Sequence, residues 1–166
     1  MKNKSLSTLL ALFITSAFIS PLQAQETPEE IVPTVIDLLT KGCDSHGVGE
    51  ACALLSQAFY DGLGVELNYV TSLHYSTKGC EKVDNPSGIA CYLAAQDYEN
   101  EVFFELDYEK AHALYDKGCE LDNSDSCWNV AYNFENGYGV KENSRQANKF
   151  YRKACDLGDQ DACDEL

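Results

Sequence analysis

Apolar, small and aromatic side chains recur along the chain in a helical pattern that begins anew at Cys52, Cys91 and Cys127. Three residues after each cysteine stands an aliphatic residue, after four a small residue, and after seven an aromatic one. Positions with this spacing share one face of an α-helix, so we expect three first helices whose apolar faces pack inward. These positions hold Leu55, Ser56 and Phe59, then Ala94, Ala95 and Tyr98, then Val130, Ala131 and Phe134.

A turn and a second helix are predicted after each first helix. Gly62 and Gly137 follow the aromatic positions, and glycine readily adopts the left-handed conformation that ends a helix. Asn68, Asp107 and Asn143 are placed to cap the second helices through their side-chain oxygens. The second helices carry Ser72, Tyr75 and Ser76, then Ala111, Leu114 and Tyr115, then Ala147, Phe150 and Tyr151.

The cysteines repeat with a nearly constant period. Cys43, Cys80, Cys119 and Cys155 are separated by 37, 39 and 36 residues, and a second series, from Cys52 to Cys163, keeps the same period. Self-similarity at this spacing indicates stacked helical hairpins, so we predict an all-α, right-handed α-solenoid of antiparallel helix pairs. The predicted units are a capping half-repeat (25–50), three repeats (51–89, 90–125 and 126–161) and a C-terminal partial helix (162–166).

The middle repeat departs from this plan at its turn. Residues 101–104, Glu-Val-Phe-Phe, stand where the other repeats have a double-glycine turn, so the pattern leaves this turn's geometry open. The loop after Cys80 is also longer than its equivalents and contains Asn85, Pro86 and Gly88. Length differences between repeats fall in loops.

The first 24 residues are typical of a secretory signal peptide. Lys2 and Lys4 precede an apolar run from Leu6 to Ile19, and the segment closes at Ala24. Its removal leaves 10 basic residues of the chain's 12, against 27 acidic ones, for a net charge of −17. Phosphate backbones and anionic lipid surfaces need clustered Lys and Arg, so we exclude nucleic-acid and membrane binding.

Eight cysteines in an exported chain indicate disulfides, because the compartment oxidises them. Zinc is the rival interpretation, but structural zinc sites usually bring two cysteines within a few residues, and the chain has no Cys-x-x-Cys. We therefore expect a protein of the bacterial periplasm or the cell exterior.

The run Ala51-Cys52, Phe59, Gly62-x-Gly64-Val65 and Gly79-Cys80 resembles the Sel-one-like repeat (SLR), a relative of the tetratricopeptide repeat. Two cysteines per repeat resemble the exported cysteine-rich branch, the Hcp β-lactamase family. The resemblance covers the chain from about Ile31 to Cys163. Its family name implies β-lactam binding or weak hydrolysis.

The repeat geometry leaves two disulfide patterns. A bridge such as Cys52–Cys80 would join the two ends of one hairpin, but this pattern leaves Cys43 and Cys163 unpaired at opposite ends of the solenoid. A bridge from each second-helix end to the next first helix uses every cysteine, and it is also the pattern that the family resemblance implies. Its pairs are Cys43–Cys52, Cys80–Cys91, Cys119–Cys127 and Cys155–Cys163.

A search for catalytic chemistry finds no established motif. No serine has a lysine three residues later, and neither Lys-Thr-Gly nor His-Glu-x-x-His occurs. His46, His74 and His112 occupy unrelated repeat positions, and we interpret them as solvated surface residues. Asp and Glu are abundant, but no carboxylate pair stands out. We expect no catalytic residue, metal or cofactor.

What remains is a predicted binding surface. Counted from the first-helix cysteines, positions +1, +5 and +8 lie on one face beside the core face, and the first helices of such solenoids line the concave side. Tyr and Trp are favoured at binding hot spots, and neighbouring glutamates favour a basic partner. An alternative is that Tyr92, Trp128 and Tyr132 pack between repeats. The candidate binding residues are Tyr60, Tyr92, Gln96, Glu99, Trp128, Tyr132 and Glu135.

Three functions follow from these observations. The first is a non-catalytic, monomeric scaffold that binds a protein or peptide along this aromatic and acidic row. The second, implied only by the family name, is β-lactam binding or weak hydrolysis. The third is an immunity or regulatory protein for one dedicated partner, which differs from the first in its partner alone.

Overall fold

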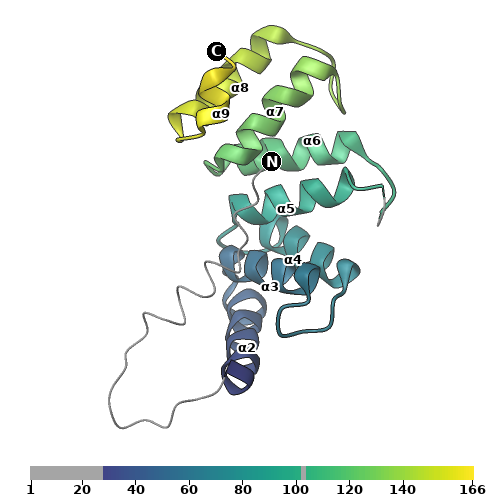
Figure 1. Cartoon of the computed structure of the whole chain (residues 1–166), viewed down its shortest axis with the longest axis vertical. Helices are drawn as coiled ribbons and strands as arrows, with labels where there is room; N and C mark the ends of the chain where they lie inside the picture. Colours follow the sequence, from purple (N-terminus) through teal and green to yellow (C-terminus); the bar gives the residue numbers. More distant parts are fainter. Residues whose placement is uncertain (1–27, 102–103) are drawn as a thin grey trace.

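A computed structural model describes residues 28–101 and 104–166 (Figure 1). Over these residues the chain forms eight α-helices and one isolated parallel bridge, between Val48 and Asn85. The predicted signal peptide and part of the middle turn lie outside the described residues. The helices are α2 (Pro28–His46), α3 (Gly49–Asp61), α4 (Tyr69–Glu81), α5 (Gly88–Tyr98), α6 (Tyr108–Glu120), α7 (Ser124–Asn136), α8 (Ser144–Asp156) and α9 (Gln160–Asp164).

The helices stack as successive hairpins into an elongated solenoid. The pairs α3/α4, α5/α6 and α7/α8 form three hairpins, with α2 before them and the short α9 after them (Figure 1). The three first helices, α3, α5 and α7, contact one another in series, and so do α4 and α6. The all-helical solenoid predicted from the cysteine period is confirmed.

Helix ends form where the sequence places them. Asn68, Asp107 and Asn143 each accept a hydrogen bond from the backbone N–H three residues later, at 3.0–3.2 Å. Such a cap satisfies a helix N–H that has no partner inside the helix. Gly62 and Gly137 end α3 and α7 with φ of 70° and 74°, the left-handed conformation that side chains disfavour.

The core runs through the middle of the hairpins and is built largely from small residues. Leu55, Ala94 and Val130, at the same position of the three first helices, are fully buried. The second helices contribute Tyr115 and Tyr151, each nearly fully buried. Because alanine and serine occupy most other inward positions, neighbouring helices approach closely.

All four disulfides lie at one end of the hairpins. They join each second helix to the next first helix, with Cα–Cα distances of 4.6–4.8 Å. The pairs are Cys43–Cys52, Cys80–Cys91, Cys119–Cys127 and Cys155–Cys163, and the described residues contain no free cysteine. Of the two patterns considered, the structure has the one that uses every cysteine.

The longer loop after Cys80 packs back onto the preceding repeat. Gly49 donates its backbone N–H to the Asn85 carbonyl at 2.9 Å, and Asn85 donates to the Gly47 carbonyl at 3.2 Å. Ser87 then caps α5 by accepting from the Ala90 N–H. The extra residues therefore tie two inter-repeat loops together at the disulfide end.

Candidate functional site: the face of the first helices

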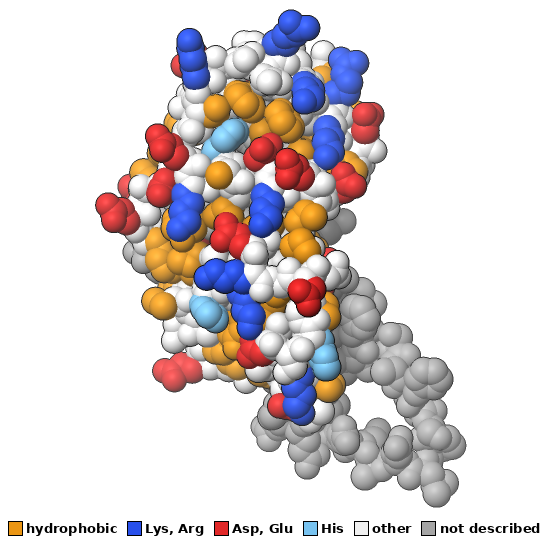
Figure 2. All heavy atoms as spheres, turned by 180° about the vertical axis from the view of Figure 1, so that it is seen from behind, with side chains coloured by type: hydrophobic (Ala, Val, Ile, Leu, Met, Phe, Trp, Pro, Cys, Tyr) orange, Lys and Arg blue, Asp and Glu red, His pale blue; other side chains and the backbone are white. Residues whose placement is uncertain are grey.

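The first helices carry no basic side chain. Lys and Arg are absent from α3, α5, α7 and α9, whereas Asp or Glu occurs in each of them. Every Lys and Arg of the described residues lies in α2, α4, α6 or α8 or in the loops beside them. Seen from behind, the molecule shows Lys and Arg along its length among acidic side chains (Figure 2). The basic side chains are therefore confined to α2, the second helices and the adjoining loops, whereas acidic side chains occur in first and second helices alike, a distribution that we call the charge division.

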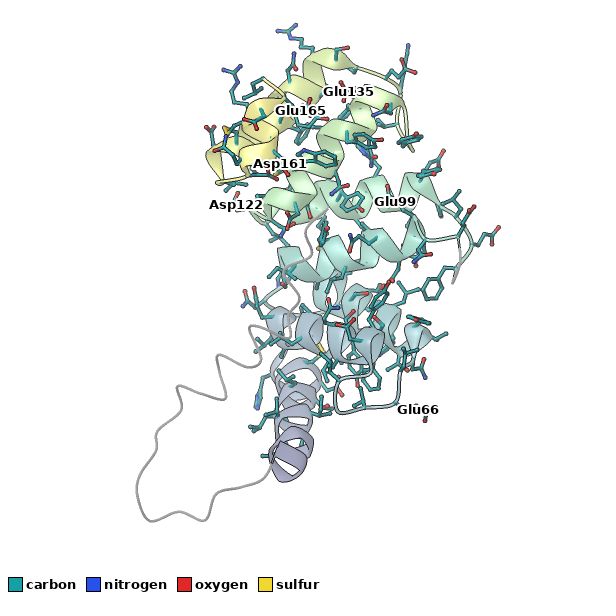
Figure 3. The ribbon with its side chains drawn as sticks, viewed as in Figure 1. Glu66, Glu99, Asp122, Glu135, Asp161 and Glu165 are labelled. Atoms are coloured by element: carbon teal, nitrogen blue, oxygen red, sulfur yellow. A yellow bond between two sulfur atoms is a disulfide. The ribbon has the colours of Figure 1, made fainter. Side chains whose placement is uncertain are left out.

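The predicted binding row lies along these first helices. Glu99 follows the end of α5 and Glu135 lies near the end of α7, on successive repeats (Figure 3). Gln96 and Tyr132 are exposed at the equivalent position of the two helices. We call the surface of α3, α5 and α7 that carries this row the first-helix face.

Four aromatic rings form a continuous series at the C-terminal end of this face. Trp128 stacks on Tyr132 with ring centroids 5.3 Å apart, and Tyr132 lies 5.9 Å from Tyr138 in the following turn. Tyr138 in turn stacks on Tyr108, at the start of α6, at 5.0 Å. The three tyrosines are 37–38% exposed, so the series, which we call the aromatic ladder, presents ring surface to solvent.

Trp128 is the anchored end of the aromatic ladder. Its ring is partly buried against the core and meets Tyr151 of α8 edge-on, at 6.1 Å. Its Nε1–H is buried and has no hydrogen-bond partner. These ring contacts lie within one repeat, so Trp128 joins the core of the third hairpin to the exposed ladder.

Two glutamates of the row are bound to tyrosines of the second helices. Tyr115 donates its hydroxyl to Glu99 at 2.9 Å, and Tyr151 donates to Glu135 at 3.0 Å. Burial raises the pKa of the Glu99 carboxyl, while the Tyr115 hydrogen bond lowers it. Both carboxylates are thus held in place, each by one hydrogen bond inside its own repeat.

The first repeat breaks this rule and leaves a pocket. Ser76 stands where the other repeats have Tyr115 and Tyr151, and Tyr60 stands where they have glutamate. Ser56 and Ser72, which hydrogen-bond to each other at 3.1 Å, replace two alanines. The first repeat therefore lacks the ring that fills this position in the other hairpins, and two serine hydroxyls line the space between the first and second repeats.

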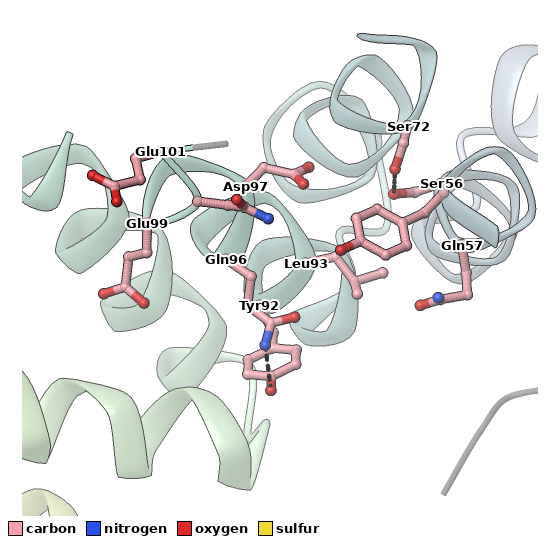
Figure 4. A pocket seen from close by; sticks show the side chains of 11 residues that line it. Ser56, Gln57, Ser72, Tyr92, Leu93, Gln96, Asp97, Glu99 and Glu101 are labelled. Atoms are coloured by element: carbon pink, nitrogen blue, oxygen red, sulfur yellow. Dashed lines mark hydrogen bonds between the residues drawn. The ribbon is translucent and has the colours of Figure 1, made fainter. Parts of the chain in front are cut away.

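This pocket has a volume of about 500 Å³ (Figure 4). Tyr92 and Gln96 lie on one side, where the Gln96 amide donates to the Tyr92 hydroxyl at 2.8 Å. Burial raises the pKa of Tyr92 to about 12, so its hydroxyl stays protonated at neutral pH. The lining residues are Ser56, Gln57, Tyr60, Ser72, Tyr92, Leu93, Gln96, Asp97, Glu99, Asn100 and Glu101.

Asp97 is the pocket residue that sequence reasoning missed. It is 6% exposed and lies on α5 where the first repeat has Ala58 and the third has Asn133. Burial raises the pKa of its carboxyl to about 7, and the nearby Ser76 hydroxyl opposes this rise. An alignment of the three repeats could have found it. Asp97 is a carboxyl at an inward position of the second repeat, and the preceding hairpin has three serines at inward positions.

The histidine prediction is correct for two residues and wrong for the third. His46 and His74 are exposed, as expected. His112 is half-buried, with its ring edge-on to Phe134 at 5.1 Å and its Nδ1 buried without a partner. The sequence pattern of α6 alone could not show this, because the ring that covers His112 belongs to the next repeat. Burial lowers the pKa of His112, and the nearby Asp116 opposes this shift.

The face offers recognition groups of three kinds: aromatic rings, amide and hydroxyl hydrogen-bonding groups, and carboxylates. Among the described residues, no group of three His, Cys, Asp or Glu side chains is arranged to hold a metal ion. In the same part of the chain, no helix has the length and apolar character needed to cross a membrane.

Comparison with solved structures finds similar solenoids. Cysteine-rich protein B of Helicobacter pylori matches with a TM-score of 0.65 and 28% identity, covering 86% of this chain and 100% of that one. A protective antigen of uropathogenic Escherichia coli that displays an SLR fold matches with a TM-score of 0.66 and 26% identity, covering 76% of this chain and 27% of that one.

A Sel1 repeat protein from Oxalobacter formigenes has a TM-score of 0.70, covering 79% of this chain and 96% of that one. Its identity is 21%, so it supports the fold alone. No curated protein matches the sequence.

The Sel1 repeat family model matches residues 49–84, 88–123 and 124–159, which together make up more than half of the chain. These limits coincide closely with the hairpins α3/α4, α5/α6 and α7/α8. Four disulfides and the likeness to the Helicobacter pylori protein add the cysteine-rich character. The chain therefore belongs to the Sel1 repeat family, as one of its cysteine-rich members.

Proposed function

We propose that this protein is an exported, non-catalytic scaffold that binds a basic protein or peptide segment along the first-helix face. Sel1 repeats act in protein interactions, which supports the general class. The observation that carries the proposal is the charge division, because α3, α7 and the Glu99 C-cap of α5 carry acidic groups, with no Lys or Arg in these three helices. Complementary charge steers a partner to a surface and selects against wrong ones.

The aromatic ladder supplies the contact area for such a partner. Tyrosine and tryptophan bring large, rigid surfaces with few rotatable bonds, and they dominate the energetics of many interfaces. Tyr132 and Tyr138 keep more than a third of their surface in solvent. A bound segment could cover these rings while its basic groups face the carboxylates of Asp125, Glu99 and Glu135.

The β-lactam alternative draws no support from the pocket. Ser56 and Ser72 hydrogen-bond to each other, and the residues that line the pocket include no lysine or histidine to activate a hydroxyl. Incubating the oxidised protein with a chromogenic cephalosporin would separate the two functions. Saturable hydrolysis that is lost in a Ser56→Ala variant would contradict the proposal.

The test of the scaffold uses a random dodecapeptide display library selected on the oxidised mature protein. We expect enriched peptides that combine Lys or Arg with apolar residues. A synthetic peptide from this set should bind at least tenfold more weakly to a Tyr132→Ala variant. Val70→Ala is the matched control, because Val70 is 72% exposed on α4, outside the first-helix face.

Charge is tested separately with Glu135→Gln, which keeps a hydrogen-bond acceptor for Tyr151 and removes the charge. Its control is Glu109→Gln, an exposed glutamate in α6. Slower association with Glu135→Gln alone would support the proposal. Selection of acidic peptides, or equal sensitivity to Val70→Ala and Tyr132→Ala, would overturn it.

The export proposal rests on residues 1–24 and on the four disulfides, which form in oxidising compartments. We expect the mature protein to begin at Gln25 and to fractionate with the periplasm or the culture medium. Mass measurement of the intact protein after fractionation checks both. An unprocessed N-terminus with eight free thiols would contradict it.

A further inference from the structure

The pocket between the first and second repeats contains a buried acidic group without a basic counterpart. Asp97 is more than nine-tenths buried, and the pocket lining includes no Lys, Arg or His. A buried carboxylate is costly unless a positive charge or several hydrogen bonds compensate it. The Ser76 hydroxyl lies near this carboxyl, but it donates its hydrogen bond to the Leu73 carbonyl at 3.1 Å. The site is thus electrostatically incomplete in the free protein.

The walls of the pocket suit a long side chain that ends in a positive charge. Leu93 and the rings of Tyr60 and Tyr92 provide surface for an alkyl stem. Tyrosine faces also attract cations through the ring quadrupole. Gln57 and Gln96 offer amide oxygens, and Glu99 and Glu101 add negative charge elsewhere in the lining.

Comparison of the repeats shows that this arrangement occurs once among them. In the second and third repeats a tyrosine occupies the position of Ser76 and engages the glutamate of its own hairpin. In the third repeat Asn133 stands in place of Asp97 and in the first Ala58 does, and neither carries a charge. Among the three repeats, the missing tyrosine ring and the buried carboxyl therefore occur together only between the first and the second.

We propose that this pocket is the subsite in which the scaffold receives one lysine or arginine side chain of its bound peptide. The ammonium or guanidinium group pairs with the Asp97 carboxylate, and the alkyl stem lies against Leu93 and the tyrosine rings. This inference rests on the proposed function, since it assigns one contact of the same face. It predicts that a basic residue is required at one position of the partner and only favoured at the others.

The test is an NMR titration of the ¹⁵N-labelled, oxidised mature protein with two amino acids whose termini are blocked and therefore uncharged. N-acetyl-lysine N-methylamide carries the charge, and N-acetyl-norleucine N-methylamide has nearly the same stem without it. We expect the lysine probe to shift backbone signals of residues 92–101 at pH 8, with an affinity at least tenfold above that of the norleucine probe. Equal affinities would overturn the inference.

Asp97→Asn is the central variant, because the third repeat already holds asparagine at this position. It should reduce the affinity for the lysine probe at least tenfold and leave signals outside the pocket unchanged. As a second variant, Tyr60→Glu combined with Ser76→Tyr installs the pair found in the other repeats and fills the pocket. Retained binding in a folded Asp97→Asn protein would contradict the assignment.

Binding should also depend on pH. The groups near Asp97 are Tyr60 from α3, Tyr115 from α6 and the Ser76 hydroxyl from α4. Tyr92, Glu99 and Glu101 lie elsewhere in the pocket lining. Asp97 is the group among them that titrates near neutrality, so affinity for the lysine probe should rise between pH 6 and pH 8. A bound cation should likewise lower the pKa of Asp97 from about 7. Stronger binding at pH 6 would contradict the inference.

Two further arms separate this inference from the scaffold function and from a free amine. Library peptides that bind wild type and Asp97→Asn equally, with no fixed basic position, would refute the subsite and leave the scaffold intact. Cadaverine and agmatine carry the same charged groups without a peptide. Affinity for either that equals the affinity for a selected peptide would refute the assignment to a peptide side chain.

Discussion

At the scale of single residues, Asp97 couples the stability of the fold to pH. Burial raises the pKa of its carboxyl to about 7, whereas an aspartate in the unfolded chain titrates near pH ~4. Between these values the native state holds a proton that the unfolded state has lost. The free energy of unfolding therefore falls as pH rises through this window, and the stabilisation is complete only below it.

Asp97→Asn removes this dependence because the amide never ionises. Relative to wild type, the variant should gain about 2 kcal/mol in free energy of unfolding between pH 4.5 and pH 8. This is less than the full shift implies, because the carboxyl borders a pocket that water can enter. Urea unfolding followed by circular dichroism at several pH values provides the measurement. Parallel pH profiles for the two proteins would show that Asp97 titrates normally.

Two neighbouring rings of the aromatic ladder, Trp128 and Tyr132, should respond differently to truncation. Trp128→Ala removes a ring packed against Tyr151 and the core, so we expect a loss of about 3 kcal/mol in free energy of unfolding. Tyr132→Ala removes a more exposed ring and should cost less than ~1 kcal/mol. Urea midpoints of the two variants give the comparison, and similar losses would contradict the distinction between an anchored Trp128 and an exposed Tyr132.

Residue-level prediction succeeded where one helix decides the outcome and failed where two repeats meet. Leu55 and Val130 are buried because their own helix directs them inward, and periodicity shows this. Asp97 and His112 depend on a neighbour: serines of the preceding hairpin surround the first, and Phe134 of the next covers the second. A repeat alignment shows equivalent positions but not which columns of adjacent repeats touch.

At the scale of the helices, the local signals were sufficient for most boundaries. Asn68, Asp107 and Asn143 cap the second helices as predicted, since an N-cap hydrogen bond involves only residues within one turn. The middle repeat was the exception. Its α5 ends at Tyr98, and Glu99 follows in a helical conformation without a left-handed glycine. No short-range rule assigns a conformation to a turn that lacks glycine, proline and asparagine at the usual places.

The disulfide end of the hairpins should tolerate no added side-chain atom at Gly79. A Cβ built there would lie 2.7 Å from the Cys52 Cβ and 2.9 Å from the Ala90 Cβ. Gly79→Ala should therefore lower the free energy of unfolding by about 1 to 3 kcal/mol, although alanine favours an open helix by about 1 kcal/mol.

Thermal and urea unfolding of the Gly79→Ala protein would measure this effect. The third repeat already has Ala154 at the equivalent position, so Ala154→Gly is the natural control. It should lose helix propensity and the packing of one buried methyl group, with no steric clash. A stabilised Gly79→Ala protein would mean that the two helices separate easily at this point.

At the scale of the whole molecule, the four disulfides should decide whether the solenoid folds. Each bridge closes a loop with a sequence separation of 8 to 11 residues, worth about 2.5 kcal/mol in the chain-entropy model. Together they approach the total stability of a typical domain, about 5–15 kcal/mol.

Reduction should therefore abolish the cooperative thermal transition near neutral pH. Circular dichroism with and without a thiol reductant checks this, and peptide mapping without reductant checks the four pairs. A reduced protein that melts like the oxidised one would show that helix packing alone holds the repeats together. The solenoid itself was predictable because a nearly constant cysteine period is the sequence signature of stacked repeats. The partner of the binding face has no such signature in the sequence.

The position of the bridges also determines how much the Asp97 pocket can widen or narrow. They lie at the starts of α3, α5 and α7, whereas the Asp97 pocket is lined from the second halves of α3 and α5. Helix α3 extends about 14 Å beyond Cys52, so a rotation of ~5° between adjacent hairpins displaces its far end by roughly 1 Å. The displacement is therefore smallest at the disulfides and larger at the pocket. Small rotations between two repeats can adjust the width of the pocket to its occupant, while the spacing of the repeats at the disulfide end stays fixed.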